Sequence, residues 1–430
     1  MTEPDLSRQI DRRMALAREW DELVEQVRAL KGFEDFLRPP RIERLREAAA
    51  GGPVVIINVS QWRCDALIVR AGVEVAGVEL GDLTLDAVTD RVQAYLIALH
   101  DDQTAHLAMV DARDEELAGN ISRADLLAAI QAYEQVNAAT EAHLTGLLAW
   151  MWDVITKPVL DALKLNGSAP ADQDPPRLWW CPTGALTLLP MHAAGRHDIP
   201  GASVIDRVVS SYTPTLRALL EAQTRSTSAP ATAVRDSMAV VALSDTPGQT
   251  SLPNVTREVE LLQRLLPDRL ELLCGEDATV AAVLETVTAR RWAHFSCHGD
   301  QNLAEPSQGG LLLHDGLLSI TDITARQYHG DFAFLSACKT ATGGFDLPDE
   351  AITLAAALHY TGYKHVIATL WSVWDRGAAD VTESVYEQIV QDGRVHPQRS
   401  AAALHRAVVE LRGRNLDRPS VWIPFIHIGP

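Results

Sequence analysis

The feature that most constrains this chain is a regular alternation of short apolar runs and helical patterns over residues 238–430. The runs have the length and composition of buried strands, and strands that alternate with helices predict a mostly parallel sheet covered on both faces. The expected strands are MAVVALSD (238–245), LELLCG (270–275), RWAHFSCHG (291–299), DFAFLSACKT (331–340), KHVIATLWSV (364–373) and VWIPFIHIG (421–429). The expected helices lie at about 255–265, 278–290, 349–361, 376–392 and 398–413.

Residues 1–52 have a different pattern, which predicts N-terminal helices. Over 5–31 the apolar positions recur every three or four residues, as they do in an amphipathic helix. We expect the apolar stripe of this helix to pack on its own domain rather than on a separate partner. A second helix is expected over 41–50, because Gly51-Gly52 follows it.

Residues 53–220 predict an α+β subdomain. Three β-rich runs, PVVIINVS, CDALIVR and AGVEVAGVEL, are separated by turn-length gaps and predict an antiparallel meander. Helical patterning follows over 85–100 and 122–163, and RLWWCPTGALTLLPMHAAG predicts a strand, a turn and a second short strand. A Ser/Thr/Ala/Pro-rich segment at 221–237 is the expected linker. The expected parts are therefore 1–52, 53–220 and 238–430.

The charge of the chain narrows the classes of partner. Its formal net charge is -19, from 57 acidic and 38 basic residues, which disfavours nucleic acid and anionic membranes as main partners because both are polyanions. A protein or peptide substrate fits better. The first twenty residues are charged and lack the apolar core of a secretory signal, and the most apolar window, ITLAAALHYTGYKHVIATLW, predicts a buried helix and strand instead of a membrane span. We therefore expect a cytoplasmic protein.

The five cysteines do not form a metal-binding or disulfide pattern. They are scattered and include no CxxC pair, so the spacing favours neither a zinc ribbon nor a thioredoxin-type motif. They are Cys64, Cys181, Cys274, Cys297 and Cys338.

Two of the predicted strands end in residues that can perform nucleophilic catalysis. RWAHFSCHG ends at His298-Gly299, and DFAFLSACKT runs into Cys338. In an open parallel sheet, reactive groups gather at the carboxyl ends of the strands. If the two strands are neighbours, an imidazole and a thiol leave the sheet side by side. A thiol nucleophile needs that arrangement, because only the thiolate attacks and an imidazole can accept its proton.

These motifs resemble the CHAT family of caspase-like cysteine peptidases, which is related to separase and the caspases. The core S-A-C-K-T is similar in kind to the caspase signature, and His298 lies about 40 residues upstream of Cys338, compared with about 50 in caspases. The resemblance covers about 175–430 and, more weakly, 53–175. It is carried by HFSCHG, FLSACKT, LWWCPTGALTLLPMHAAG, VSSYTPTLRAL, LPNVTREVELL, GYKHVIATLWSVWD and WIPFIHIG.

The resemblance implies a caspase-like catalytic domain with specific roles for three residues. His298 and Cys338 would form the catalytic dyad, and the backbone N–H groups of Gly299 and Cys338 would form the oxyanion hole. A residue without Cβ at 299 also lets the backbone approach a developing oxyanion closely. The subdomain over 53–220 would be either an inactive, protease-like half or the remnant of a joint to a repeat array. No metal or organic cofactor would be needed. Related proteases act in programmed cell death or defence.

Each of these residues also has a structural interpretation. Taken alone, Cys338 would be a buried structural thiol, the commonest state of a cysteine without a disulfide. Cys297 is a rival nucleophile, but neighbouring strand residues point to opposite faces, so it cannot easily pair with His298 and is expected in the core. His294 and His298 are about 13 Å apart on a strand, which is too far for a shared metal. We expect His294 to be a packed core residue, and Cys64, Cys181 and Cys274 to be structural.

Acidic residues near the strand ends are candidates for a pocket that selects Lys or Arg before the scissile bond. Asp375 is the first candidate, and Asp300 and Asp346 are the others. Asp349 and Glu350 are instead expected to cap the helix that begins at 351. The segment LLLHDGLLS predicts a hairpin with its turn at Asp315-Gly316, bordering the cleft.

Three functions remain open at this point. The first is a cysteine endopeptidase that cleaves a protein substrate through a thioester at Cys338, controlled by an activating partner protein. The second is a catalytically silent caspase-like scaffold that binds a partner through its acidic surface or its amino-terminal helix. The third is a thiol hydrolase for small amides.

Overall fold

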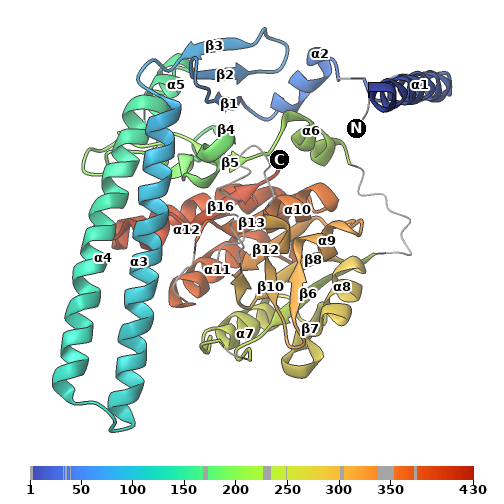
Figure 1. Cartoon of the computed structure of the whole chain (residues 1–430). Helices are drawn as coiled ribbons and strands as arrows, with labels where there is room; N and C mark the ends of the chain where they lie inside the picture. The colour runs from blue at the N-terminus through green and yellow to red at the C-terminus, as the bar shows by residue number, and fades with distance from the viewer. Residues whose placement is uncertain are drawn as a thin grey trace.

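The fold is seen in a computed structural model. It describes residues 3–31, 33, 36–38, 40–167, 173–225, 234–247, 249–300, 305–337, 353–371 and 375–430, without the side chains of 3–11, 306, 375 and 376. Within these residues a single large sheet has the strand order β3-β2-β1-β4-β5-β16-β13-β12-β8-β6-β7 (Figure 1). Most neighbouring strands run parallel, which confirms the predicted α/β class.

The strands of this sheet match the predicted runs closely, except for β5, which lies where no strand was predicted. They are β1 (Val54–Asn58), β2 (Asp65–Val69), β3 (Ala76–Glu79), β4 (Arg177–Pro182), β5 (Val209–Tyr212), β6 (Arg235–Ala242), β7 (Leu270–Cys274), β8 (Arg290–Ser296), β12 (Phe332–Ser336), β13 (His365–Thr369) and β16 (Phe425–Ile428). A second small sheet contains β9 (Gly299–Asp300), β10 (Gly310–Leu312) and β11 (Leu317–Ser319), and β14 (Val390–Gln391) pairs with β15 (Arg394–Val395). The last strand of the large sheet begins later than expected, because a short helix precedes it.

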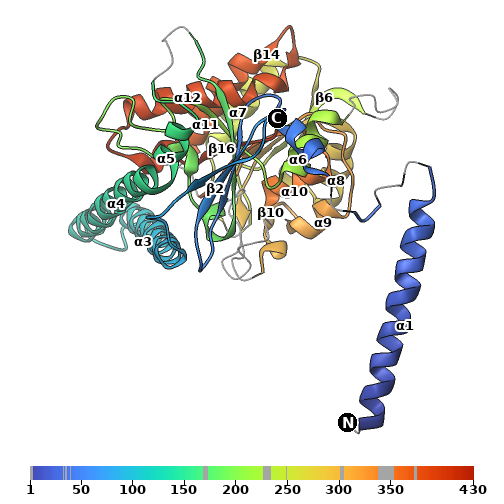
Figure 2. The same cartoon turned by 90° about the horizontal axis from the view of Figure 1, so that it is seen from above.

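Helices cover both faces of the sheet, as the alternation predicts. The α-helices of the described residues are α1 (Glu3–Arg28), α2 (Ile42–Leu45), α3 (Leu85–Leu117), α4 (Arg123–Met151), α5 (Lys157–Ala162), α6 (Leu216–Thr224), α7 (Val255–Leu265), α8 (Val280–Thr288), α9 (Ile320–Thr324), α10 (Leu354–Thr361), α11 (Asp375–Ile389), α12 (Ser400–Arg414) and α13 (Pro419–Trp422). Figure 2 shows α7, α11 and α12 on one side of the sheet and α6, α8, α9 and α10 on the other. The strands between these layers are apolar on both faces, and β13 is buried along its whole length.

The amino-terminal strands join the same sheet as the carboxyl-terminal ones. β1, β2 and β3 form the predicted antiparallel meander, and β4 extends it by pairing in parallel with β1. β5 then pairs with β16 through the single bridge Tyr212–Ile428, which connects the two halves of the chain. The prediction of a second short strand after Pro182 was wrong. A 3-10 turn, Gly184–Leu188, stands there, and Gly184 has a positive φ of 58° that begins it.

The amino-terminal helix is present, but the prediction of how it packs was wrong. Its apolar stripe was expected to pack on its own domain, but Met14, Trp20, Leu23 and Leu30 are more than half exposed. Among the described side chains of α1, only Val24 is buried. Figure 2 shows α1 standing away from the sheet and its helices. Periodicity predicts which face of a helix is apolar, but it does not say whether that face meets another element.

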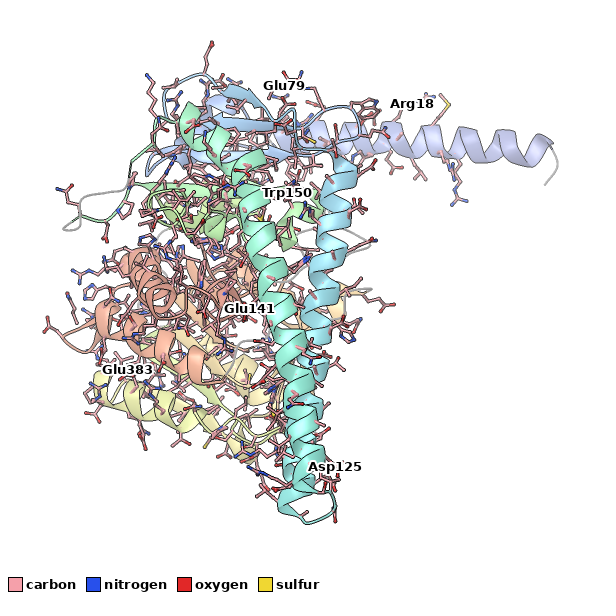
Figure 3. The ribbon with its side chains drawn as sticks, turned by 90° about the vertical axis from the view of Figure 1, so that its left-hand side faces the viewer. Arg18, Glu79, Asp125, Glu141, Trp150 and Glu383 are labelled. Carbon is pink, nitrogen blue, oxygen red and sulfur yellow. The ribbon has the colours of Figure 1, made fainter. Side chains whose placement is uncertain are left out.

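The helices α3 and α4 form a long antiparallel hairpin that projects beyond the sheet. Figure 3 shows it from Trp150, beside the amino-terminal strands, to Asp125 near its tip. The helix expected over 85–100 continues to Leu117, and a capping box at Ser122 starts the return helix. No helix of the described residues is long and apolar enough to cross a membrane.

Candidate active site

The two strands that lead to the predicted dyad are neighbours, as expected. β8 and β12 run parallel, with Ser296 opposite Ser336 at their last residues. Adjacent strands lie about 4.8 Å apart, so the chain leaves both strands at one edge of the sheet. His298 is the second residue after the end of β8. The described chain continues past β12 as far as Ala337, so the predicted nucleophile, Cys338, lies outside the described residues.

His298 is held in one tautomer by the backbone. Its Nε2 atom lies 2.7 Å from the carbonyl oxygen of Thr250, in the loop between β6 and α7. A carbonyl only accepts, so Nε2 must carry the proton and donate it. The Nδ1 atom then has a lone pair, and it makes no hydrogen bond with any residue that the structure describes. A partly exposed imidazole with a free Nδ1 lone pair can act as a general base.

Gly299 lies on the outer edge of the small sheet. β9 pairs antiparallel with β10, and the amide of Leu312 donates to the carbonyl of His298. In an antiparallel ladder such a bond makes Gly299 and Leu311 a non-hydrogen-bonded pair. The N–H of Gly299 therefore points away from β10. Since β9 ends the order of the described strands in this sheet, that N–H faces the open edge.

The hairpin predicted beside the cleft is present. β10 and β11 pair antiparallel, and their turn contains Asp315 and Gly316. Gly316 has a φ of 152°, which side chains rarely adopt. Asp315 accepts a hydrogen bond of 2.8 Å from the amide of Val280, the first residue of α8. The hairpin that supports Gly299 is thus tied to the adjacent helix.

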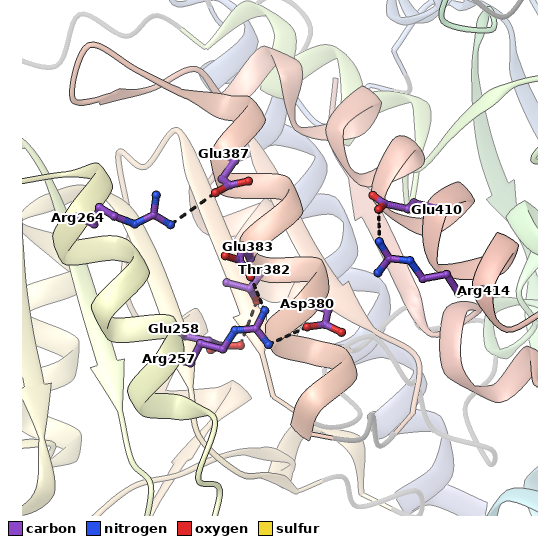
Figure 4. Close-up of polar contacts among 9 residues, drawn as sticks. All are labelled: Arg257, Glu258, Arg264, Asp380, Thr382, Glu383, Glu387, Glu410 and Arg414. Atoms are coloured by element: carbon purple, nitrogen blue, oxygen red, sulfur yellow. Dashed lines mark hydrogen bonds and ion pairs between the residues drawn. The ribbon is translucent and has the colours of Figure 1, made fainter.

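A buried carboxylate lies directly behind the two strand ends. Glu258 of α7 is only 3% exposed, and its side chain contacts both β8 and β12. Nε2 of His294 donates to its Oε2 atom at 3.1 Å, and the hydroxyl of Ser336 donates to Oε1 at 2.8 Å. The hydroxyl of Thr382 on α11 donates to Oε1 at 3.1 Å, and Figure 4 shows the two residues facing each other.

This environment keeps Glu258 ionised. Burial by itself raises the pKa of a carboxyl, but the hydrogen bonds from His294, Ser296 and Ser336 outweigh it and lower the pKa of Glu258 below its usual value. His294 is fully buried, as expected, and its Nδ1 atom lies 3.1 Å from the hydroxyl oxygen of Tyr386. Both ring nitrogens of His294 thus face protein groups, which leaves neither for a metal.

The sequence analysis did not identify Glu258 as a residue of the site. A signal was present, because Glu258 occupies an apolar position of its helix, three residues after Val255 and three before Leu261, both of which are buried. A charged residue on the buried face of an amphipathic helix needs a polar partner in the core. The partners come from residues far away in the chain, so the sequence did not identify them.

The candidate specificity residues are only partly described. Asp300 is exposed in β9. Asp375 is the first residue of α11, and its side chain is not described. Asp346 lies outside the described residues. Asp349 and Glu350 also lie outside them. The helix expected to begin at 351 is described from Leu354, where Thr353 is the N-cap and accepts from the amide of Ala356 at 3.0 Å.

Three of the other cysteines are buried and one is exposed. Cys297 is 1% exposed, in agreement with its predicted place in the core. Cys64 and Cys181 are also buried, and burial raises the pKa of the Cys181 thiol to about 12. Cys274 was expected to be structural as well, but it is exposed at the end of the edge strand β7. Among the described residues no group of three His, Cys, Asp or Glu side chains is placed to hold a metal.

The family model of the CHAT domain matches residues 145–430, which is more than half of the chain. The chain belongs to the CHAT domain family. The match begins upstream of the region, about 175–430, over which the motifs resemble the family, and it includes the end of α4. No curated protein matches this CHAT chain in sequence.

Solved structures of separase support the caspase-like fold. A chain of the Saccharomyces cerevisiae separase–securin complex is similar with a TM-score of 0.61 at 9% identity, over 90% of the CHAT chain and 31% of that chain. The CHAT chain thus spans about a third of the length of this relative. The Arg-specific cysteine proteinase gingipain R of Porphyromonas gingivalis gives a TM-score of 0.42 at 11% identity, over 64% of the CHAT chain and 68% of that chain.

Proposed function

We propose that this CHAT protein is a cysteine endopeptidase with Cys338 as nucleophile and His298 as general base. The observation that carries the proposal is the register of β8 and β12, whose last residues lie opposite each other just before His298 and Cys338. The tautomer of His298 adds support, because the Thr250 carbonyl leaves the Nδ1 lone pair available. The family match and the separase-like fold agree with a peptidase.

The proposed reaction has two halves. His298 accepts the proton of the Cys338 thiol at Nδ1, and the thiolate attacks the carbonyl carbon of the scissile peptide. The oxyanion is stabilised by the outward-facing N–H of Gly299 and by the N–H of Cys338. The imidazolium returns its proton to the leaving amine, and a thioester remains. Water, deprotonated by His298, then hydrolyses the thioester and releases the acid product.

An active-site probe tests this function directly. We expect a peptide with an electrophilic carboxyl terminus to label the wild-type protein once, and mass spectrometry of the digest to place the label on Cys338. A matched peptide without the electrophile is the control. Labelling of Cys274, the exposed cysteine, with none on Cys338 would contradict the proposal and favour a silent scaffold that binds protein partners.

We further propose that the acidic residues near the site select a basic residue before the scissile bond. Asp375, at the start of α11, is the first candidate, and Asp300 and Asp346 are the others. In a peptide library we expect Asp375→Asn to lower kcat/KM for Lys and Arg substrates by roughly tenfold, because a charge-assisted contact is lost. Glu410→Gln, an exposed carboxylate of α12 that pairs with Arg414, is the matched control. An unchanged preference in Asp375→Asn would remove this residue from the pocket.

A further inference from the structure

The buried carboxylate of Glu258 holds together the two strands that carry the proposed dyad. Ser336 is the last residue of β12, and its hydroxyl donates to Glu258 at 2.8 Å. Ser296, the last residue of β8, helps to lower the pKa of the same carboxyl. His294, two residues before Ser296 on the same face of β8, donates to it as well. One buried side chain thus joins the ends of both strands.

Contacts between α7, which carries Glu258, and α11 hold the carboxylate in place. Thr382 of α11 is fully buried and donates to Glu258, and the neighbouring Arg257 forms ion pairs with Asp380 and Glu383 of the same helix (Figure 4). α7 is therefore attached to α11 at Glu258 and at the residue before it. Displacing the carboxylate would require these helices to separate.

We propose that Glu258 is a positioning residue, whose contacts with the ends of β8 and β12 set the separation of His298 and Cys338. This rests on the proposed dyad, because it assigns Glu258 a role in aligning those two groups. The two residues follow their strands closely, so a small shift of one strand end moves the imidazole relative to the thiol. A misplacement of about 1 Å can cost a reaction as much as a hundredfold in rate.

A buried carboxylate elsewhere in the chain provides a matched control. Glu141 of α4 is also buried and accepts from the hydroxyl and the amide of Ser420, the latter at 3.0 Å. Figure 3 shows Glu141 on the long hairpin. Removing the hydroxyl of Ser420 or of Ser336 takes one donor from a buried carboxylate in each case. Only Ser336 lies at the end of a strand that leads to the dyad.

The experiment compares Ser336→Ala and Glu258→Gln with Ser420→Ala and Glu141→Gln in the full chain. Cys338 is alkylated with iodoacetamide at pH 7 and followed by mass spectrometry, and thermal unfolding is recorded for each variant. We expect Ser336→Ala to lower the alkylation rate by roughly tenfold, because a displaced His298 no longer favours the thiolate. We expect Ser420→Ala to stay within about twofold at a similar loss of stability. If Glu258→Gln does not fold, Ser336→Ala carries the test.

The outcomes separate the positioning role from the peptidase function. Equal alkylation rates in Ser336→Ala and Ser420→Ala, or rates that follow only the unfolding temperature, would overturn the role of Glu258. The measurement needs no peptide substrate. A wild-type protein that cleaves no peptide, but shows the expected difference between the two serine variants, would disprove the peptidase function and retain the positioning role. In variants that do cleave, kcat should fall in Ser336→Ala while KM is unchanged.

Discussion

Cys338→Ala is expected to abolish peptide cleavage, with a loss of roughly a thousandfold or more in kcat/KM. The methyl group of Ala cannot form the thioester, so the covalent route is removed altogether. His298→Ala is expected to lose a similar factor, because the thiol then has no base to accept its proton. The double variant should be no slower than either single variant, since the two groups act as one unit. Steady-state cleavage of a fluorogenic peptide measures all three.

The control for the cysteine is Cys274→Ala. Cys274 is an exposed thiol on the edge strand β7, away from the ends of β8 and β12 in the sheet order, so its loss should leave the rate within about twofold. Cleavage by Cys338→Ala at the wild-type rate would show that another group is the nucleophile. A slow His298→Ala variant whose rate recovers at high pH would support the general-base role, because hydroxide then generates the thiolate.

The sequence predicted the fold well where strands are buried on both faces. β8, β12 and β13 read as continuous apolar runs, and their parallel order followed from the helices between them. It did not predict that β5 and β16 join the two halves into one sheet. That pairing is a single bridge between residues far apart in the chain, and no local sequence pattern predicts it.

The candidate site was predictable only as far as local signals reach. His298-Gly299 and Cys338 stand at the ends of recognisable strands, so they could be found from the sequence. The carbonyl of Thr250 and the carboxylate of Glu258 reach the site from separate elements, a loop and α7. Their contribution depends on tertiary packing, and backbone carbonyls carry no sequence signal at all. Their role could only be seen in the structure.

Lowering the pH from 7.5 to 5 is expected to unfold the protein. Four of the buried histidines have a lowered pKa, and burial lowers the pKa of His192 and of His359 to about 4 and that of His365 to about 3. Burial and the neighbouring His365 also lower the pKa of His427 well below its usual value. In the unfolded chain all four titrate near 6.5.

The sign follows from which state binds protons. Below pH 6.5 the unfolded chain binds protons that the folded protein excludes, so stability is complete above that pH and falls as the solution becomes more acidic. Each histidine costs about 1.4 kcal/mol per pH unit until its folded pKa is reached. Four such groups cost on the order of 5 kcal/mol per unit, and a native protein has only about 5–15 kcal/mol to lose. Urea unfolding at pH 7.5, 6 and 5 measures this loss.

His359→Gln isolates one of these groups. It should reduce the fall in unfolding free energy between pH 7.5 and 5 by about 2 kcal/mol, because one buried titrating group is gone. His329→Gln removes an exposed histidine and is the matched control, expected to leave the pH dependence unchanged. A wild-type free energy that stays constant between pH 7.5 and 5 would contradict the prediction.

The structure also indicates which strands open first as the pH falls. Arg177 donates to the hydroxyl of Ser211 at 2.7 Å, Ser211 lies 2.8 Å from Nδ1 of His427, and Nε2 of His427 lies 3.2 Å from Nδ1 of His365. This chain of contacts crosses β4, β5, β16 and β13, the strands at which the two halves of the sheet meet. Protonating either histidine adds a charge near the half-buried guanidinium of Arg177, at a junction with only one backbone bridge. We therefore expect hydrogen exchange of the β5 and β16 amides to rise at a higher pH than exchange in β8 and β12.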